Sequence, residues 1–101
     1  MYQFTTPLIT ITIPEDLPVA TIDKLVVTLK QGSLKIEKIQ SEVTFDATEN
    51  KIFVHLSQEE TGMFGPGSVQ VQCHILVGDT AYATNIMTAN IYANIHGEVI
   101  A

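Results

Sequence analysis

The chain has 101 residues, a length typical of one domain, and we expect a single domain over residues 1–101. With 46% hydrophobic residues it can bury a core, and because it has no Trp and only seven other aromatic residues, that core is expected to be aliphatic. A net charge of −6 with no Arg disfavours nucleic acid and anionic membranes as partners, because both repel a negative chain.

No membrane-spanning segment or signal peptide is predicted. The longest apolar runs are only a few residues, far short of the roughly 20 needed to cross a bilayer. The N-terminal residues carry neither a positive charge nor an apolar block. The single Cys73 cannot form an internal disulfide, so the fold does not rely on an oxidising compartment. We therefore expect a protein synthesised in a cytoplasm.

Apolar and polar residues alternate along most of the chain, as they do in antiparallel strands with one buried face. In the first such segment, Ile9, Ile11 and Ile13 alternate with Thr10 and Thr12. The same pattern continues to the C-terminal part of the chain. It predicts strands at residues 4–13, 23–31, 33–39, 42–46, 51–57, 68–77 and 80–95.

Turn-forming residues separate these segments. Pro14 and Pro18 interrupt the chain after the first strand, because proline donates no ladder hydrogen bond. Gly32 and Gly78 mark two hairpins, and residues 46–50 form a polar loop. About seven strands in a chain of 101 residues favour an all-β fold, an antiparallel immunoglobulin-like β-sandwich. A seven-stranded barrel is the alternative.

One short helical turn is predicted at residues 58–63, where the chain crosses between the strands at 51–57 and 68–77. Ser57 and Glu60 have the spacing of a capping box, in which each side chain bonds the other residue's backbone N–H. Gly62 is expected to end the turn, and Phe64 to fill the end of the core.

Six segments of the chain form a recognisable set: Val54-His-Leu-Ser-Gln-Glu-Glu-Thr61, Phe64, Gly67, Val69-Gln-Val-Gln72, Phe4-Thr-Thr-Pro7 and Ala81-Tyr-Ala-Thr-Asn-Ile86. These segments resemble a group of small proteins encoded in prophages of Gram-positive bacteria. The layout is also similar to the N-terminal immunoglobulin-like domain of the phage baseplate upper protein family. Residues 90–96 lack the basic character associated with the group. The resemblance implies a virion-located structural module that binds itself and other virion proteins and has no catalytic residue.

The Cys and His residues do not predict a reactive or metal site. Cys73 and His74 are neighbours on a strand, so their side chains point to opposite faces, and Cys73 shares the apolar face. His55 and His74 are expected on different sheets, facing opposite sides of the molecule, and His96 lies near the C-terminus. We therefore predict no catalytic residue, no metal and no cofactor.

Three polar motifs also have structural interpretations. Residues 46–50 copy the start of a calcium loop, but Lys51 stands where that loop needs Gly and Ser57 where it needs Glu. Glu15 and Asp16 are expected at a solvated loop tip, with no aromatic cluster to support sugar chemistry. Ser57 lies outside any nucleophile-elbow motif.

Three function classes remain, and none of them is enzymatic. The first is a phage or prophage structural and interaction module of a tail, baseplate or head. The second is a carbohydrate- or surface-binding sandwich, such as an adhesin domain, which needs exposed aromatics. Phe45 and Phe64 are expected in the core, so few aromatics remain for such a groove. The third is an intracellular partner-binding module unrelated to phage.

The C-terminal part of the chain predicts self-association. Residues 61–101 carry only two charges, Asp79 and Glu98, and the last predicted strand carries Thr, Asn and Tyr at its polar positions. Exposed edge strands usually carry charges that prevent edge-to-edge pairing, whereas interfaces are depleted of charge and enriched in Tyr. The alternative is that a neighbouring segment covers this strand within the monomer. We expect a homo-oligomer whose contact uses side chains on one face, Asn90, Tyr92, Asn94 and His96.

Overall fold

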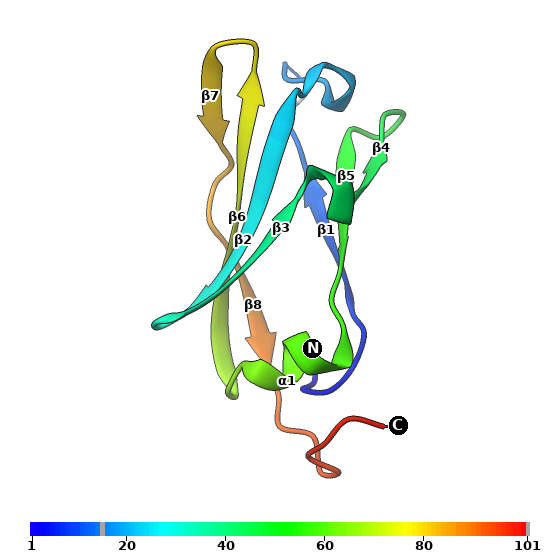
Figure 1. The fold of residues 1–101 in the computed structure, drawn as a ribbon, viewed down its shortest axis with the longest axis vertical. Coiled ribbons are helices and arrows are strands. Elements are labelled where there is room, and N and C mark those ends of the chain that lie inside the picture. Colours follow the sequence, from blue (N-terminus) through cyan, green and yellow to red (C-terminus); the bar gives the residue numbers. More distant parts are fainter. Residues whose placement is uncertain (15, 101) are drawn as a thin grey trace.

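The computed structural model describes residues 1–14 and 16–100 as an all-β sandwich of two antiparallel sheets (Figure 1). The smaller sheet has the strand order β1-β5-β4; the larger has the order β3-β2-β6, and both β7 and β8 pair with β6. The strands are β1 (Leu8–Thr12), β2 (Lys24–Gln31), β3 (Leu34–Ile39), β4 (Thr44–Asp46), β5 (Lys51–His55), β6 (Gly67–Val77), β7 (Thr80–Ala83) and β8 (Met87–Ile91). The helical elements are η1 (Val19–Thr21), η2 (Gln40–Glu42) and α1 (Gln58–Met63).

The connections follow the immunoglobulin pattern. The chain changes sheet between β1 and β2, between β3 and β4, and between β5 and β6. Strands β1, β5 and β4 therefore take the places of strands B, E and D of that fold, and β3, β2 and β6 take those of C′, C and F. Strands β7 and β8 together take the place of G. Within the described ranges no strand takes the place of A beside β1.

The core lies between the two sheets and is mainly aliphatic, as expected. Ile11 and Ile13 of the first predicted segment are buried, whereas Thr10 and Thr12 are exposed, so the predicted alternation is confirmed. Phe64 is 0% exposed and is the one aromatic among the buried residues that the structure describes. Phe45 is partly buried against this core.

The predicted strand at 80–95 is wrong as a single element, because a bulge divides it into β7 and β8. His74 of β6 pairs with Ala83, and Val71 pairs with Met87. Residues 72 and 73 of β6 therefore lie opposite three residues, 84–86, of the segment that joins β7 to β8. Thr84 occupies this bulge: its Oγ1 accepts from the Cys73 N–H at 3.0 Å, and its own N–H donates to the Cys73 carbonyl at 2.9 Å. The extra residue reverses which side chains face the core.

The predicted strands at both ends of the chain are too long. The first begins at Leu8, because Phe4 has a left-handed backbone with φ of 57°. Strand β8 ends at Ile91, and beyond it Asn94 donates its side-chain N–H to the Gln3 carbonyl. A parallel bridge joins Tyr2 to Tyr92 between these two segments.

Two internal strands are also shorter than predicted. The strand expected at 42–46 begins at Thr44, because Glu42 belongs to η2 and accepts a hydrogen bond from the Ile39 N–H. The strand expected at 51–57 ends at His55, because Ser57 already caps the following helix.

Helix α1 closes one end of the sandwich, at the predicted crossover between β5 and β6 (Figure 1). The capping box is confirmed: Ser57 Oγ accepts from the Glu60 N–H at 3.1 Å, and Glu60 Oε1 accepts from the Ser57 N–H at 2.8 Å. Gly62 does not end the helix, which continues to Met63. A Cβ at Gly62 would overlap the ring of Phe4, so a larger residue here would force that ring to move.

The N-terminal segment is fixed to α1 by buried Thr61. Its Oγ1 donates to the Thr5 carbonyl at 2.8 Å and accepts from the Thr5 N–H at 3.0 Å. Gln3 also donates its side-chain N–H to the Phe64 carbonyl at 2.6 Å. These bonds place residues 3–5 across the α1 end of the sandwich.

Truncating Phe64 should destabilise the fold strongly, because it leaves a cavity in a fully buried site. We expect Phe64→Ala to lower the free energy of unfolding by roughly 3–5 kcal/mol in urea denaturation. Met63→Ala, at an exposed neighbouring position, should change it by no more than about 0.5 kcal/mol. Similar losses in both variants would contradict the role of Phe64.

Candidate functional site

The Cys73–His74 pair has the geometry expected of neighbours on a strand. Cys73 is 0% exposed within the core, and burial raises the pKa of its thiol to about 11. The thiolate is therefore scarce at neutral pH, and the thiol acts as a small apolar side chain. His74 is exposed on the outer face of the larger sheet.

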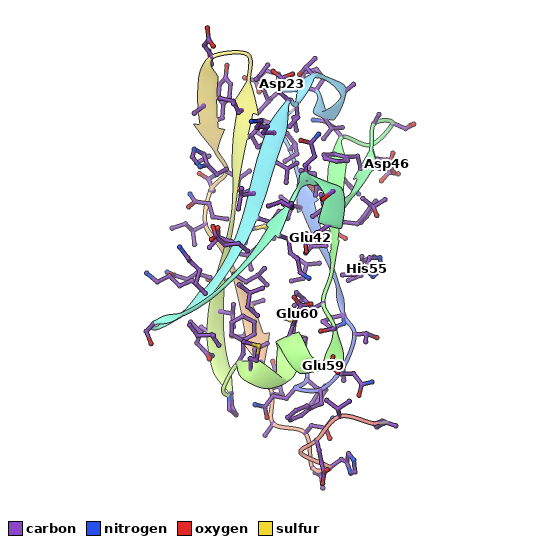
Figure 2. The ribbon with its side chains drawn as sticks, in the orientation of Figure 1. Asp23, Glu42, Asp46, His55, Glu59 and Glu60 are labelled. Atoms are coloured by element: carbon purple, nitrogen blue, oxygen red, sulfur yellow. The ribbon has the colours of Figure 1, made fainter. Side chains whose placement is uncertain are left out.

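The three histidines lie far apart in the fold. His55 is exposed on β5 of the smaller sheet, and His74 is on β6 of the larger sheet, so they face opposite sides as expected. His96 lies in the tail beyond β8. Figure 2 shows His55 and the labelled carboxylates distributed along the length of the molecule. Among residues 1–14 and 16–100, no group of three or more His, Cys, Asp or Glu could hold a metal ion.

The polar loop at residues 46–50 uses its oxygen atoms to form a turn. Asp46 Oδ1 accepts from the backbone N–H groups of Thr48 and Glu49, at 3.0 and 3.2 Å. The other motif residue, Asn50, points into the fold. Of the predicted loop tip at Glu15 and Asp16, Glu15 lies outside the described residues, and Asp16 is exposed.

Asn50 joins this loop to the connection between β1 and β2, a role that the sequence did not suggest. Its side-chain N–H groups donate to the carbonyls of Ile13 and Pro14, both at 3.0 Å, and its Oδ1 accepts from the Val19 N–H at 2.7 Å. Its backbone φ is 56°, a left-handed conformation that Asn tolerates better than most residues. Asn50 therefore fixes Ile13, Pro14 and Val19 at this end of the core.

Removing the Asn50 side chain should loosen this connection. We expect Asn50→Ala to lower the free energy of unfolding by about 1–3 kcal/mol, because it leaves partly buried polar groups without partners and adds backbone strain. Asn50→Gly removes the same hydrogen bonds but tolerates the positive φ, so it should be less destabilising than Asn50→Ala. Urea denaturation of the three proteins provides the measurement. Equal stability of wild type and Asn50→Ala would contradict this role.

A partly buried ion pair joins β3 to α1. Lys38 Nζ lies 2.6 Å from Glu60 Oε2, and both residues are half-buried. Burial acts to raise the pKa of Glu60, but the hydrogen bonds from Lys38 and from the Ser57 backbone, together with the Lys38 charge, outweigh it and lower the pKa.

The Glu60 carboxylate should stabilise the fold in a pH-dependent way. Because the pKa of Glu60 is lower in the folded state, the stabilisation is present above the unfolded pKa of about 4.3 and is lost as the pH falls through the folded pKa. The difference in free energy of unfolding between wild type and Glu60→Gln should therefore be largest at neutral pH and shrink below about pH 4. A difference independent of pH would contradict the ion pair.

The four predicted interface residues do not share one strand face. Asn90 is exposed on β8, and exposed Tyr92 lies beside Tyr2, with ring centroids 5.4 Å apart. Asn94 is half-buried and bonded to Gln3, and His96 is exposed in the tail. The Tyr92 N–H also donates to the Met1 carbonyl at 2.8 Å. The N-terminal segment thus covers part of this backbone, while the side chains of Asn90, Tyr92 and His96 stay available to a partner.

Both termini lie at the α1 end of the molecule (Figure 1), and several exposed apolar residues belong to the segments at this end. Ile95 is fully exposed, at 106% of its reference area, and Tyr92 is 52% exposed. Ile100 is held near α1 by two hydrogen bonds between its backbone and the Gln58 side chain. We call this set the terminal patch, and it consists of Tyr2, Met63, Tyr92, Ile95 and Ile100.

Two adjoining hollows lie between β1 and β7–β8, and we call them together the side groove. Their volumes are about 250 and 230 Å³, and both are lined by Pro14, Ala83 and Thr84. The other residues that line one hollow are Asp16, Leu17, Ile75 and Tyr82, and those that line the other are Ile11, Thr12, Asn85 and Met87. The alternation pattern could not predict the groove, because it reports the face of each strand and not which strands lie opposite one another.

A further hollow of about 470 Å³ lies on the outer face of the larger sheet. Its polar lining consists mainly of Lys30, Gln70, Gln72 and His74, and no Phe, Tyr or Trp lines it among the residues that the structure describes. It can offer hydrogen bonds and a positive charge. The stacking surface typical of a sugar site is missing from that lining.

A comparison with known protein families and with curated proteins finds no match to this chain. Separately, no helix in the described part of the chain is long and apolar enough to span a membrane.

Proposed function

We propose that this protein is a non-enzymatic structural and interaction module of a phage or prophage particle, which binds itself and other virion proteins. The terminal patch is the observation that supports this function best. It places exposed Tyr and Ile side chains beside both termini. Most of these side chains belong to residues 61–101, a stretch of the sequence that carries only two charges. Protein interfaces combine these two properties, enrichment in aromatic residues and depletion of charge.

The fold agrees with this proposal. An immunoglobulin-like sandwich is the layout that the resemblance to the N-terminal domain of the phage baseplate upper protein family implies. Rigid sandwiches suit structural modules, because their termini and edges can contact neighbouring subunits while the core stays intact. Surface binding to carbohydrate is the second candidate. The polar hollow beside Lys30 and Gln70 is the one feature that favours it.

Particle composition tests the proposed function directly. Particles should be purified by density gradient from the bacterium that carries the gene, after prophage induction, and analysed by quantitative mass spectrometry. We expect the protein in several copies per particle, at a constant ratio to the capsid protein. Its presence in the cell lysate together with its absence from intact particles would contradict the proposal.

The proposed self-contact can be tested at Tyr92 with the purified protein. We expect Tyr92→Lys to weaken self-association at least about tenfold, because a charged side chain must be desolvated in the contact. Light scattering over a dilution series provides the measurement, and Tyr92→Phe, which keeps the ring, is the matched control. A wild-type protein that stays monomeric at high concentration would contradict the contact through Asn90, Tyr92, Asn94 and His96.

A further inference from the structure

Strand β1 has one free edge. Its register with β5 pairs Ile9 with Val54 and Ile11 with Ile52, and the Ile13 N–H donates to the Asn50 carbonyl. Hydrogen-bonded and non-hydrogen-bonded pairs alternate in an antiparallel ladder, so the odd-numbered residues of this segment bond to β5. The N–H and C=O groups of Leu8, Thr10 and Thr12 therefore point away from β5. Among the described residues, β5 is the only strand paired with β1.

The inner face of β7 and β8 is incompletely covered beside that edge. Tyr82 pairs with Ile75, and Met87 pairs with Val71, and both partners belong to the buried core. Tyr82 and Met87 therefore face inward, yet they are 45% and 39% exposed. In a complete immunoglobulin fold, strand A occupies the space beside the strand that β1 replaces. Here that space is the side groove.

The side groove is large enough for aliphatic side chains. Each of its two hollows, of about 250 and 230 Å³, exceeds the ~150 Å³ of an apolar cavity that binds benzene. Core residues line both hollows, Ile75 one and Ile11 the other. A strand added to the free edge of β1 would bring alternate side chains over these hollows.

The C-terminal tail, residues 93–100, has the pattern of such a strand. Ala93, Ile95, Gly97 and Val99 alternate with Asn94, His96 and Glu98. In this structure the tail is not in a strand; it leaves the sandwich below α1, at the end away from β7 (Figure 1). Ile95 is wholly exposed, and the Gln58 side chain holds Ile100 by two exposed hydrogen bonds. Eight extended residues span roughly 27 Å, more than the five residues of β1 require.

We propose that the side groove of one copy binds the C-terminal tail of a second copy as an added strand on β1. Ile95 and Val99 would enter the hollows, and Asn94, His96 and Glu98 would face solvent. The tail backbone would pair with the free groups of Leu8, Thr10 and Thr12. The proposal rests on the self-association part of the proposed function, but it places Ile95 and Val99 in the contact and leaves Asn94 and His96 facing solvent.

Such a contact joins two different surfaces, so it is heterologous. The tail leaves one copy at the α1 end, and the groove lies toward the opposite end, near Pro14 and Tyr82. Repeated contacts of this kind build an open row or a ring. They would also bring Tyr92 of the donor close to the next copy.

Two variants that each damage one side of the contact provide the test. Met87→Glu places a charge in the groove and leaves the tail intact, whereas Ile95→Glu damages the tail and leaves the groove intact. We expect each variant to remain folded by circular dichroism and to be monomeric where wild type forms oligomers. An equimolar mixture should form a dimer and nothing larger, because the mixture contains one intact tail and one intact groove per pair.

A peptide provides an independent measurement that does not depend on the folding of Met87→Glu. The peptide of residues 92–100 should bind full-length Ile95→Glu protein and shift the NMR signals of Thr10, Thr12 and Tyr82. The same peptide with Glu at position 95 should bind at least tenfold more weakly.

Three results would overturn the inference. The first is oligomerisation of both single variants as in wild type, which would show that another surface joins the copies. The second is a wild-type protein that is monomeric at all concentrations. The third is a monomeric wild type whose melting temperature falls on Ile95→Glu substitution, which would place the tail in its own groove. In each case the particle-composition experiment still decides the proposed function separately.

Discussion

The smaller sheet is one strand too narrow to cover the larger one, and the rest of the structure depends on this constraint. The N-terminal segment covers the α1 end of the uncovered side, through the packing of Phe4 on Gly62 and the hydrogen bonds between Thr5 and Thr61. The connection after β1 covers the opposite end, where Asn50 holds it by its side-chain amide. Between these two covers lies the side groove.

The bulge at Thr84 determines the chemistry of that groove. Without the extra residue, the inward positions of β7 and β8 would follow one alternation. With it, even-numbered Tyr82 and odd-numbered Met87 both face inward. The bulge is stabilised because Thr84 bonds to the Cys73 backbone through both its side chain and its main chain. The groove is therefore lined by the large side chains of Tyr82 and Met87 together with Ala83 and Thr84 between them.

The sequence predicted the features that depend on local patterns. The alternation around Ile11 located the first buried face, and the Ser57 capping box located the helix at the crossover. The bulge, the left-handed Phe4 and the Asn50 hydrogen bonds depend on partners distant in the chain, so no local pattern contains them. The candidate site was predicted in part for the same reason. Asn90 and Tyr92 are exposed, as the strand pattern predicts. The contact of Asn94 with Gln3 and the side groove arise from tertiary packing, which the local pattern does not contain.

Amide hydrogen exchange in β1, measured by NMR on dilute monomer, tests the central claim that β1 has a free edge. A free edge predicts slow exchange for Ile9 and Ile11, whose N–H groups bond to β5, and for Ile13, whose N–H bonds to the Asn50 carbonyl, and fast exchange for Leu8, Thr10 and Thr12. Equal protection of both sets in the monomer would show that another segment already pairs with this edge, and would contradict a free edge on β1.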